Sequence, residues 1–290
     1  MRTLHREEFL ALAAIAEREA GLHLPDSKRA FVEARLQRRL RRCGYESFGA
    51  YSDLVRSDAP GGMHERQMMI SALTTNVTHL FREPHHFSLL ADHFRSWLTT
   101  LGPRNRRYLV WSAGCSTGEE PLSIAATLHG VLGRDWSSHA DVLATDVDHA
   151  VLDIARHRGS DLEIVASLRG QVSGADRSVL CDRGARAFLR NLTDSITYLH
   201  HNLLHPLDVP GQFNAIFCRN VTIYFSETTR ARVHERIAAR LAPGGLLAIG
   251  HSERLPGASG FASVGRTAYR DDHGSIRRSA FDGIGEPGCP

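Results

Sequence analysis

Apolar residues recur at helical spacing throughout the first 75 residues of the chain. The periodicity predicts helices at 5–20, 28–43, 47–57 and 64–73, with the last two separated by the break Ala59-Pro60-Gly61-Gly62. Pro25-Asp26-Ser27 is typical of a helix start and marks the beginning of the second helix. We therefore expect residues 1–75 to form an all-helical domain.

Beyond Pro103, short apolar runs alternate with helical segments. Strands are expected at 107–113, 141–146, 196–200, 213–218 and 245–251, and helices at 121–132, 150–157 and 228–241. This alternation predicts an α/β domain with a mostly parallel, doubly wound, Rossmann-like sheet. Residues 261–269 fit an antiparallel hairpin at its edge, so the domain is expected to cover residues 76–270.

Two segments do not fit the alternation. The stretch between the helix at 150–157 and the strand at 196–200 is too long for a simple connection, and it carries a candidate helix near 176–181 and the apolar run 187–189. We expect a small inserted β subdomain at about 160–200, which either only connects its neighbours or contacts a partner. Residues 271–290 have a weak pattern that is typical of a mobile tail.

The composition is that of a soluble globular protein, with 42% hydrophobic and 23% charged residues among 290. No apolar run approaches the roughly 20 residues that span a bilayer, and the first residues lack the apolar core of a signal peptide. These features favour a cytoplasmic location without direct membrane insertion. A net charge of +3 is too small to indicate nucleic-acid binding. The oligomeric state stays open, with a monomer expected.

Neither the cysteines nor the histidines have the spacing of a metal site. The five cysteines are scattered and never form CxxC, which also argues against a disulfide framework. The pairs His85-His86 and His200-His201 are adjacent, so their side chains point in different directions on a helix or a strand. No metal is expected.

The expected helix at 28–43 carries a strongly basic face. Seven cations stand against one acid, Glu33, in the fifteen residues 28–42. A solvated helix face is the simpler interpretation. The excess of cations is larger than solubility requires, however, and favours docking to an acidic partner. The candidate partner-binding residues are Arg35, Arg38, Arg39 and Arg42.

Residues 109–121 read Leu-Val-Trp-Ser-Ala-Gly-Cys-Ser-Thr-Gly-Glu-Glu-Pro and are the most informative stretch. An apolar strand breaks there into small residues and then opens a helix, which is where Rossmann-like sheets hold a nucleotide-like ligand. Gly114 and Gly118 let such a ligand approach the backbone. The turn either only caps its helix, through Ser116 with Glu119 or Thr117 with Glu120, or also binds a ligand. Two carboxylates at a helix N-terminus repel phosphate, which favours a cationic or hydroxyl-rich ligand.

Three further segments follow strands toward the same edge of the sheet. Asp146 ends the second strand and suits the hydroxyls of a ribose, because Asp148 is the more natural cap of the next helix. Asn202 and Leu203 follow the third strand, at the position where an amide and an apolar side chain bracket an adenine ring. Residues 219–225, Arg-Asn-Val-Thr-Ile-Tyr-Phe, follow the fourth strand, and polar groups directly after a buried strand need partners.

A polar cluster also precedes the sheet, at residues 74–83, Thr-Thr-Asn-Val-Thr-His-Leu-Phe-Arg-Glu, and read alone it is an interdomain linker. Together with 111–121, 217–225 and the glycine-rich 243–247 followed by Gly250-His251-Ser252-Glu253, it resembles the CheR-type chemotaxis receptor methyltransferases. These enzymes methylate glutamates with S-adenosylmethionine. The resemblance runs from about residue 5 to residue 270, with four matching blocks in the right order.

The resemblance implies a helical receptor-docking domain, a methyltransferase domain and a small β subdomain inserted in the latter. Arg82 and Tyr224 match the catalytic residues proposed to act nearest the methyl group, and the basic helix matches the helix that faces the receptor's cytoplasmic domain. The turn itself contributes Gly114 to the cofactor site. The other cofactor contacts that the resemblance implies are Asn76, Thr78, Arg82, Glu120, Asp146, Asn202, Leu203, Arg219 and Asn220.

Two departures from the family pattern stand out. Thr222 replaces a commonly apolar residue, and the insertion between Asp176 and Ile196 is short, which favours action without a tethering receptor peptide. Three alternatives stay open: the same transfer in a non-chemotactic signalling array, a catalytically silent binding module, and a nucleotide-dependent oxidoreductase. The absence of GxGxxG and the acidic pair at the turn disfavour the oxidoreductase.

Overall fold

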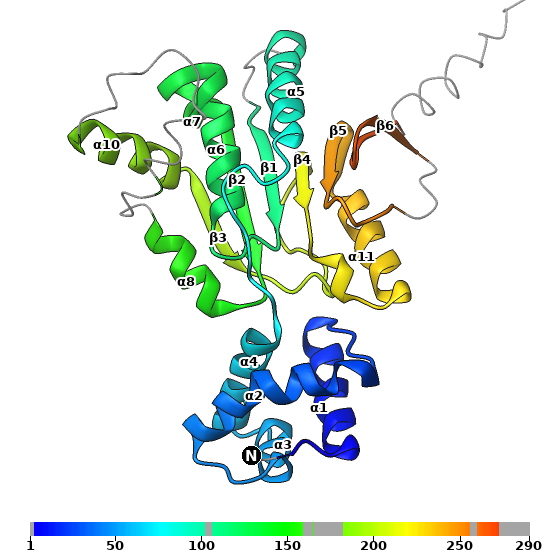
Figure 1. Ribbon diagram of the computed structural model, residues 1–290. Helices are drawn as coiled ribbons and strands as arrows, with labels where there is room; N and C mark the ends of the chain where they lie inside the picture. Colours follow the sequence, from blue (N-terminus) through cyan, green and yellow to red (C-terminus); the bar gives the residue numbers. More distant parts are fainter. Residues whose placement is uncertain (1–2, 102–105, 159–163, 165–181, 256–259, 273–290) are drawn as a thin grey trace, which may run out of the picture.

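A computed structural model describes residues 3–101, 106–158, 164, 182–255 and 260–272. The chain forms a helical domain and an α/β domain, joined by a linker that runs from the last helix of the former to the first helix of the latter (Figure 1). The expected tail beyond residue 272 and residues 159–163 and 165–181 of the expected insertion lie outside the described residues.

The helical domain consists of α1 (Arg6–Ala20), α2 (Arg29–Cys43), α3 (Phe48–Arg56) and α4 (Pro60–Leu73), with a short 3-10 turn, Asp26–Lys28, before α2. This confirms the four predicted helices. Their apolar stripes meet in one core, because residues spaced three or four apart lie on the same face of a helix. The fully buried members include Phe9, Leu12, Val32, Leu36, Tyr51 and Met69.

The start of α4 corrects one prediction. The sequence Ala59-Pro60-Gly61-Gly62 was expected to be a break, but α4 begins at Pro60. Proline at the first helical position loses no hydrogen bond and already has the helical φ, so it starts a helix as readily as it interrupts one. Gly62 lies within α4, where the carbonyl oxygens of Leu54 and Ser57 leave no room for a Cβ atom.

The α/β domain is built on seven strands: β1 (Tyr108–Ala113), β2 (Ala140–Asp146), β3 (Ile196–His200), β4 (Phe213–Cys218), β5 (Leu241–Ile249), β6 (Phe261–Gly265) and β7 (Ala268–Asp271). Their order in the sheet is β3-β2-β1-β4-β5-β7-β6. The first five are parallel, and β7 runs antiparallel to β5 and β6. The predicted doubly wound sheet with a hairpin at its edge is therefore confirmed.

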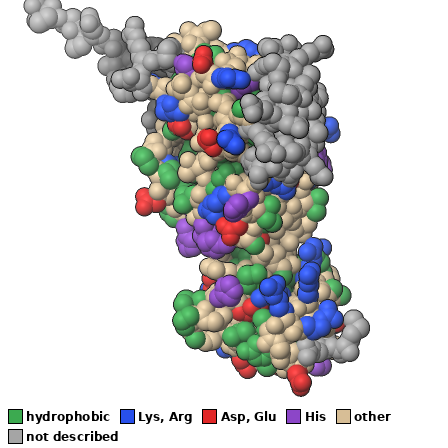
Figure 2. Space-filling view, turned by 90° about the vertical axis from the view of Figure 1, so that its left-hand side faces the viewer, with side chains coloured by type: hydrophobic (Ala, Val, Ile, Leu, Met, Phe, Trp, Pro, Cys, Tyr) green, Lys and Arg blue, Asp and Glu red, His purple; other side chains and the backbone are tan. Residues whose placement is uncertain are grey.

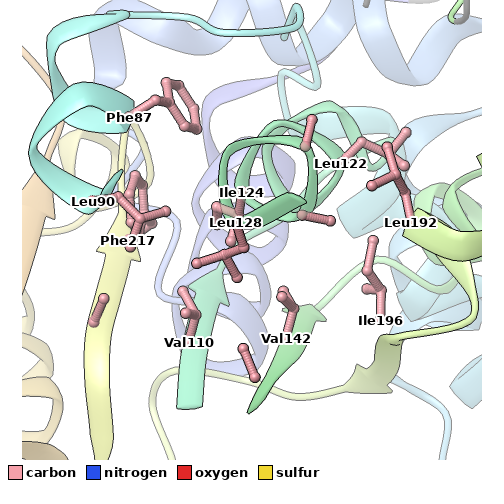
Figure 3. Packing of buried hydrophobic residues seen from close by; sticks show 14 of the residues in the cluster. Phe87, Leu90, Val110, Leu122, Ile124, Leu128, Val142, Leu192, Ile196 and Phe217 are labelled. Carbon is pink, nitrogen blue, oxygen red and sulfur yellow. The ribbon is translucent and has the colours of Figure 1, made fainter. Parts of the chain in front are cut away.

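Helices cover both faces of the sheet. The helices of this domain are α5 (His85–Leu101), α6 (Glu119–Leu132), α7 (Trp136–His139), α8 (His149–His157), α10 (Asp182–Thr193) and α11 (Glu227–Ala239). Figure 3 shows Leu122, Ile124 and Leu128 of α6 above Val110 and Val142 of the neighbouring strands. Residues next in sequence point to the opposite face, where Trp111 and Ile216 pack with Val233 and Ile237 of α11.

The described part of the expected β subdomain is helical. Residues 187–189 lie in α10, whose Phe188, Leu189 and Leu192 join the core beneath α6, and 196–200 is a strand of the main sheet. Residues 182–193 of the expected insertion thus form a helix, because the spacing of these apolar residues suits one helix face. The rest of that expectation falls on residues 159–163 and 165–181, outside the described part.

The chain reverses its direction of winding between β1 and β4, which are neighbours in the sheet. Ligands of open α/β sheets bind outside the carboxyl ends of the strands at this switch point. The helical domain lies against that edge of the sheet (Figure 1), so any cavity there has walls from both domains. Among the described residues, no helix is long and apolar enough to cross a membrane.

Candidate functional site

A cavity lies between the carboxyl ends of the strands, the interdomain linker and the end of α1. It encloses about 940 Å³, part of which is open to solvent. The structure brings together on its wall every residue predicted to bind a cofactor or to act in catalysis. These are Asn76, Thr78, Arg82, Gly114, Glu120, Asp146, Asn202, Leu203, Arg219, Asn220 and Tyr224.

Asp146 stands at the end of β2, where backbone N–H groups fix its carboxylate. Oδ2 accepts a hydrogen bond from Ser116 N at 2.8 Å, and Oδ1 accepts one from Asp148 N at 3.0 Å. Burial raises the pKa of Asp146 above its ordinary value, although these two bonds oppose the rise. Asp148 caps α8 by accepting a bond from Ala150 N at 2.9 Å, as predicted, which leaves Asp146 facing the cavity.

The glycine turn after β1 is shaped by close packing. Gly114 has φ +86°, and a Cβ atom there would overlap the Val221 side chain from the loop after β4. Neither of the two capping boxes that the turn could form is present. The N-cap of α6 is Gly118, which is left-handed and makes no side-chain cap. The chain reaches α6 through left-handed residues at Ser116 and Gly118, so neither hydroxyl meets the free N–H groups of the helix.

Glu119 and Glu120, which take no part in capping α6, have separate partners. Glu119 pairs with Arg158 at 2.6 Å. Glu120 accepts a bond from Ser112 Oγ at 2.7 Å and one from Arg219 Nη1 at 3.0 Å. Burial raises the pKa of Glu120, and the positive charge of Arg219 only partly offsets that rise.

Arg219 is the centre of a buried charged network beside the cavity. Besides Glu120, its guanidinium lies 3.5 Å from Glu83 Oε2 and donates to the carbonyl of Arg82. Burial alone would raise the pKa of Glu83, but Arg219 and His251 outweigh it and hold that pKa below its ordinary value. Nearby His86 is fully buried, and burial together with the charge of Arg219 lowers its pKa to about 4.

Three polar contacts hold the helical domain and the linker against the sheet. Asn202 donates from Nδ2 to Glu19 O at 2.6 Å and accepts from Leu204 N at 2.9 Å, so its amide already has two protein partners. Tyr224 O accepts from His23 N at 2.8 Å. Asn76 Nδ2 donates to Asp148 Oδ2 at 3.3 Å. The cavity is thus closed on one side by contacts between the domains.

Several residues of the cavity wall were not predicted from the sequence. Ala20 and Leu22 come from the end of α1, and their contribution depends on how the helical domain docks, for which the sequence carries no local signal. Val221 lies within the motif 219–225, which is the sequence signal for its place on the wall. The other unpredicted wall residues are Thr74, Thr75, Val77, His79, Cys115, Ser116, Val147, His201 and Phe225.

The basic face of α2 is only partly exposed. Arg35, Arg38 and Arg42 are exposed, and Figure 2 shows Lys and Arg side chains on the lower, helical domain. The assignment of Arg39 to the partner surface was wrong. Its guanidinium donates to Glu65 at 3.0 and 2.5 Å, and its side chain is only 12% exposed. Helical geometry places Arg39 beside the apolar stripe of Leu36 and Leu40, facing α4.

In the described part of the chain, one group of side chains brings potential metal ligands together. Atoms of Glu83, His85 and His86 lie within 4.8 Å of one another. The Nε2 atoms of both histidines already contact Arg266 O, and the cation of Arg219 is 3.5 Å from the Glu83 carboxylate. This positive charge opposes a metal ion, so the group gives no reason to add a metal to the site.

Both domains match known protein families. Residues 7–74 match the all-alpha domain of CheR methyltransferases, and residues 76–269 match the SAM-binding domain of CheR methyltransferases. The chain belongs to the CheR methyltransferase family. It is therefore an S-adenosylmethionine-dependent methyltransferase of chemotaxis.

Curated relatives agree over nearly the whole chain. A probable chemotaxis protein methyltransferase of Rhizobium etli is 38% identical over 274 residues, which are 90% of this chain and 98% of that protein. The chemotaxis protein methyltransferase of Escherichia coli is 41% identical over 254 residues, covering 85% of this chain and 84% of that protein. Chemotaxis protein methyltransferase 2 of Pseudomonas aeruginosa is 39% identical, with 91% and 92% covered.

Proposed function

We propose that this enzyme transfers a methyl group from S-adenosylmethionine to glutamate side chains on the cytoplasmic domain of chemoreceptors. The products are glutamate methyl esters and S-adenosylhomocysteine, and the reaction takes place in the cytoplasm. The observation that carries the proposal is the gathering of the predicted cofactor and catalytic residues on one cavity wall. The exposed Arg35, Arg38 and Arg42 supply a basic surface for an acidic partner.

The cavity residues fit the chemical groups of this cofactor. Asp146 presents a carboxylate oriented by two backbone amides, which suits the two hydroxyls of a ribose. Glu120 suits an ammonium group, and Arg82 suits a carboxylate, so together they match the charges of an amino-acid moiety. Leu203 offers an apolar surface for an adenine ring. The carboxylates of Glu119 and Glu120 at the start of α6 disfavour a phosphate-rich ligand.

Methyl transfer depends on positioning by the protein more than on acid or base groups. When bound, S-adenosylmethionine supplies an electrophilic methyl group on a sulfonium. A glutamate, with an ordinary pKa near 4.3, is already ionised at neutral pH and needs no general base. Arg82, fixed by its bond to Val77 O at 3.1 Å, is the group that orients a carboxylate. Tyr224 offers a ring face and a hydroxyl toward a cation.

Radiolabelled methyl transfer tests the proposal. The enzyme is mixed with labelled S-adenosylmethionine and receptor-containing membranes from the same cell, and the labelled protein is then treated with alkali. Label on a receptor band that base releases as methanol supports glutamate esters. Binding of the cofactor without any transfer would instead favour a silent binding module. Label on another membrane protein would point to a different signalling array.

Two substitutions separate the proposed roles within the cavity. Arg82→Ala is expected to lower turnover on the order of 100-fold and to weaken S-adenosylhomocysteine binding by a smaller factor, because a misplaced carboxylate loses its line of attack. Asp146→Ala is expected mainly to weaken S-adenosylhomocysteine binding. Titration calorimetry and the transfer assay measure the two quantities independently, and an equal effect of both changes on binding alone would contradict the assignment.

A further inference from the structure

Glu253 is a buried carboxylate that does not line the cavity. It binds the loop at residues 219–225, which forms part of the cavity wall. It follows β5 and is 3% exposed. Oε2 accepts hydrogen bonds from Gly250 N at 2.6 Å and from Asn220 N at 2.8 Å. Oε1 accepts from Val221 N at 3.2 Å, and from the backbone N and the hydroxyl of Thr222, each at 2.8 Å.

These bonds hold a stretch of backbone that contains a left-handed residue. Asn220 has φ +60°, a conformation that L-residues with side chains seldom adopt. Three consecutive N–H groups, at residues 220 to 222, converge on the one carboxylate, so none of them can pair along the sheet. A strained turn of this kind persists only where its surroundings over-determine it.

Close packing fixes the same loop from two further sides. A Cβ atom at Gly250 would lie 2.5 Å from Asn220 Nδ2 and 2.7 Å from its backbone N, so the chain after β5 touches the loop directly. On the other side, the Val221 side chain occupies the space beside Gly114. The loop after β4 is therefore packed between the turn after β1 and the chain after β5, and Glu253 supplies its hydrogen bonds.

We propose that Glu253 is a positioning residue for the methyltransferase site. By accepting bonds from residues 220–222, it holds Asn220 on the cavity wall and sets the direction in which the chain continues to Tyr224. Glu253 touches neither cofactor nor substrate and acts through the loop. The inference rests on the assignment of the cavity to the cofactor and is independent of the proposed receptor substrate.

Thr222 adds one bond to this arrangement. Its buried hydroxyl donates to Glu253 Oε1 and lies 3.4 Å from His234 Nε2 of α11. The three backbone N–H bonds to Glu253 do not involve this hydroxyl, so the hydroxyl adds one bond to a loop that is already held. Thr222→Val removes this one bond and keeps the three backbone bonds, which makes it a graded companion to changes at Glu253.

Affinity for S-adenosylhomocysteine is the readout that a purely structural role would leave unchanged. Glu253→Gln keeps the side-chain shape but turns one oxygen into an NH₂ group that faces N–H donors. We expect S-adenosylhomocysteine binding to weaken on the order of 100-fold, since buried N–H groups lose their charged acceptor and the loop shifts, and Thr222→Val to weaken it less than about tenfold. Hydrogen exchange of the amides of residues 220–222 should accelerate in Glu253→Gln.

Glu65→Gln is the matched control. Glu65 is a buried carboxylate with comparable exposure, 4%, and its partners are Arg39, Tyr51 and Cys43 of the helical domain. It should lower the melting temperature without changing S-adenosylhomocysteine affinity. If Glu253→Gln behaves in the same way, losing stability but binding as the wild type does, the proposal is overturned.

A second variant tests the role of Glu253 even if the first does not fold. If Glu253→Gln does not fold, Glu253→Asp retains the charge but is one methylene shorter and cannot reach both ends of the loop. Weakened binding in that variant supports the proposal, and wild-type affinity contradicts it. If the wild-type protein binds S-adenosylhomocysteine but labels no receptor, the receptor substrate is wrong, while the role of Glu253 is still decided by the binding data.

Discussion

Two buried ion-pair networks, one in each domain, use the same chemistry for different ends. In the helical domain both oxygens of Glu65 accept hydrogen bonds, from Arg39, Tyr51 and Cys43. In the α/β domain Arg219 lies between Glu83 and Glu120, but Glu83 Oε2 and Arg219 Nε have no hydrogen-bond partner among the described residues. The first network is complete, and the second borders a cavity.

The difference indicates how a buried charge relates to function. A network whose polar atoms are all satisfied by neighbouring helices connects those helices and leaves nothing for a ligand. A network whose polar atoms lack hydrogen-bond partners lowers the stability of the fold. Beside a cavity, such a network favours a ligand that supplies the missing partners.

Removing the central cation of the cavity network should have the largest effect. Arg219→Ala leaves Glu83 and Glu120 buried without their counter-charge, so we expect a loss of about 3–5 kcal/mol in the free energy of unfolding and loss of S-adenosylhomocysteine binding. Chemical denaturation and titration calorimetry measure these. Arg219→Lys, which keeps the charge, should recover part of the stability. Unchanged stability in Arg219→Ala would mean that Arg219 does not stabilise the two buried carboxylates.

Acid should weaken the cavity network before the helical one. The pKa of His86 is about 4 in the folded protein against an ordinary 6.5, so the unfolded chain takes up the proton first as pH falls. The stability that neutral, buried His86 contributes is complete above pH 6.5. It is lost as the pH falls from 6.5 to 4, on the order of 3 kcal/mol. Denaturation curves of wild type and His86→Gln across this range give the difference.

The helical network should respond at lower pH. Burial alone would raise the pKa of Glu65, but its bonds from Arg39 and Tyr51 bring that pKa below the ordinary 4.5. The stability it contributes is therefore present above pH 4.5 and declines only below it. A His86→Gln protein that loses stability between pH 6.5 and 4.5 as steeply as the wild type would show that other groups dominate there.

Neighbouring arginines on α2 should behave differently. Arg39→Ala removes the partner of a buried carboxylate and should cost about 3 kcal/mol of unfolding free energy, with S-adenosylhomocysteine affinity unchanged. Arg38→Ala, one residue away and exposed, should change stability by less than about 0.5 kcal/mol. Thermal melts of the two single variants compare them directly, and equal losses would contradict the orientation of α2.

Reversing the exposed charges should have the smallest effect on the protein itself. A triple variant with Arg35, Arg38 and Arg42 each changed to Glu should keep its stability within about 0.5 kcal/mol and its S-adenosylhomocysteine affinity. Receptor methylation should fall, and it should fall most at low salt, because screening weakens the wild-type advantage. Methylation rates at two ionic strengths test this, and a rate equal to that of the wild type would remove these residues from the docking surface.

Much of the fold follows from short-range patterns. Period-3.6 stripes predicted α1 to α3 closely, and the alternation of strands and helices predicted β1 to β4 in order. Predictions erred where one local signal permits two structures. Pro60 serves as a helix start as well as a break, and the apolar run 187–189 serves a helix face as well as a strand.

What the sequence by itself determined is the set of elements and the chemistry at their ends, because hydrophobic period and residue type act over a few neighbours along the chain. Tertiary structure alone decided that α1 supplies Ala20 and Leu22 to the cavity, that Arg39 faces Glu65, and that Glu253 holds a loop some 30 residues distant in sequence. These contacts depend on docking between elements far apart along the chain, which no local pattern encodes.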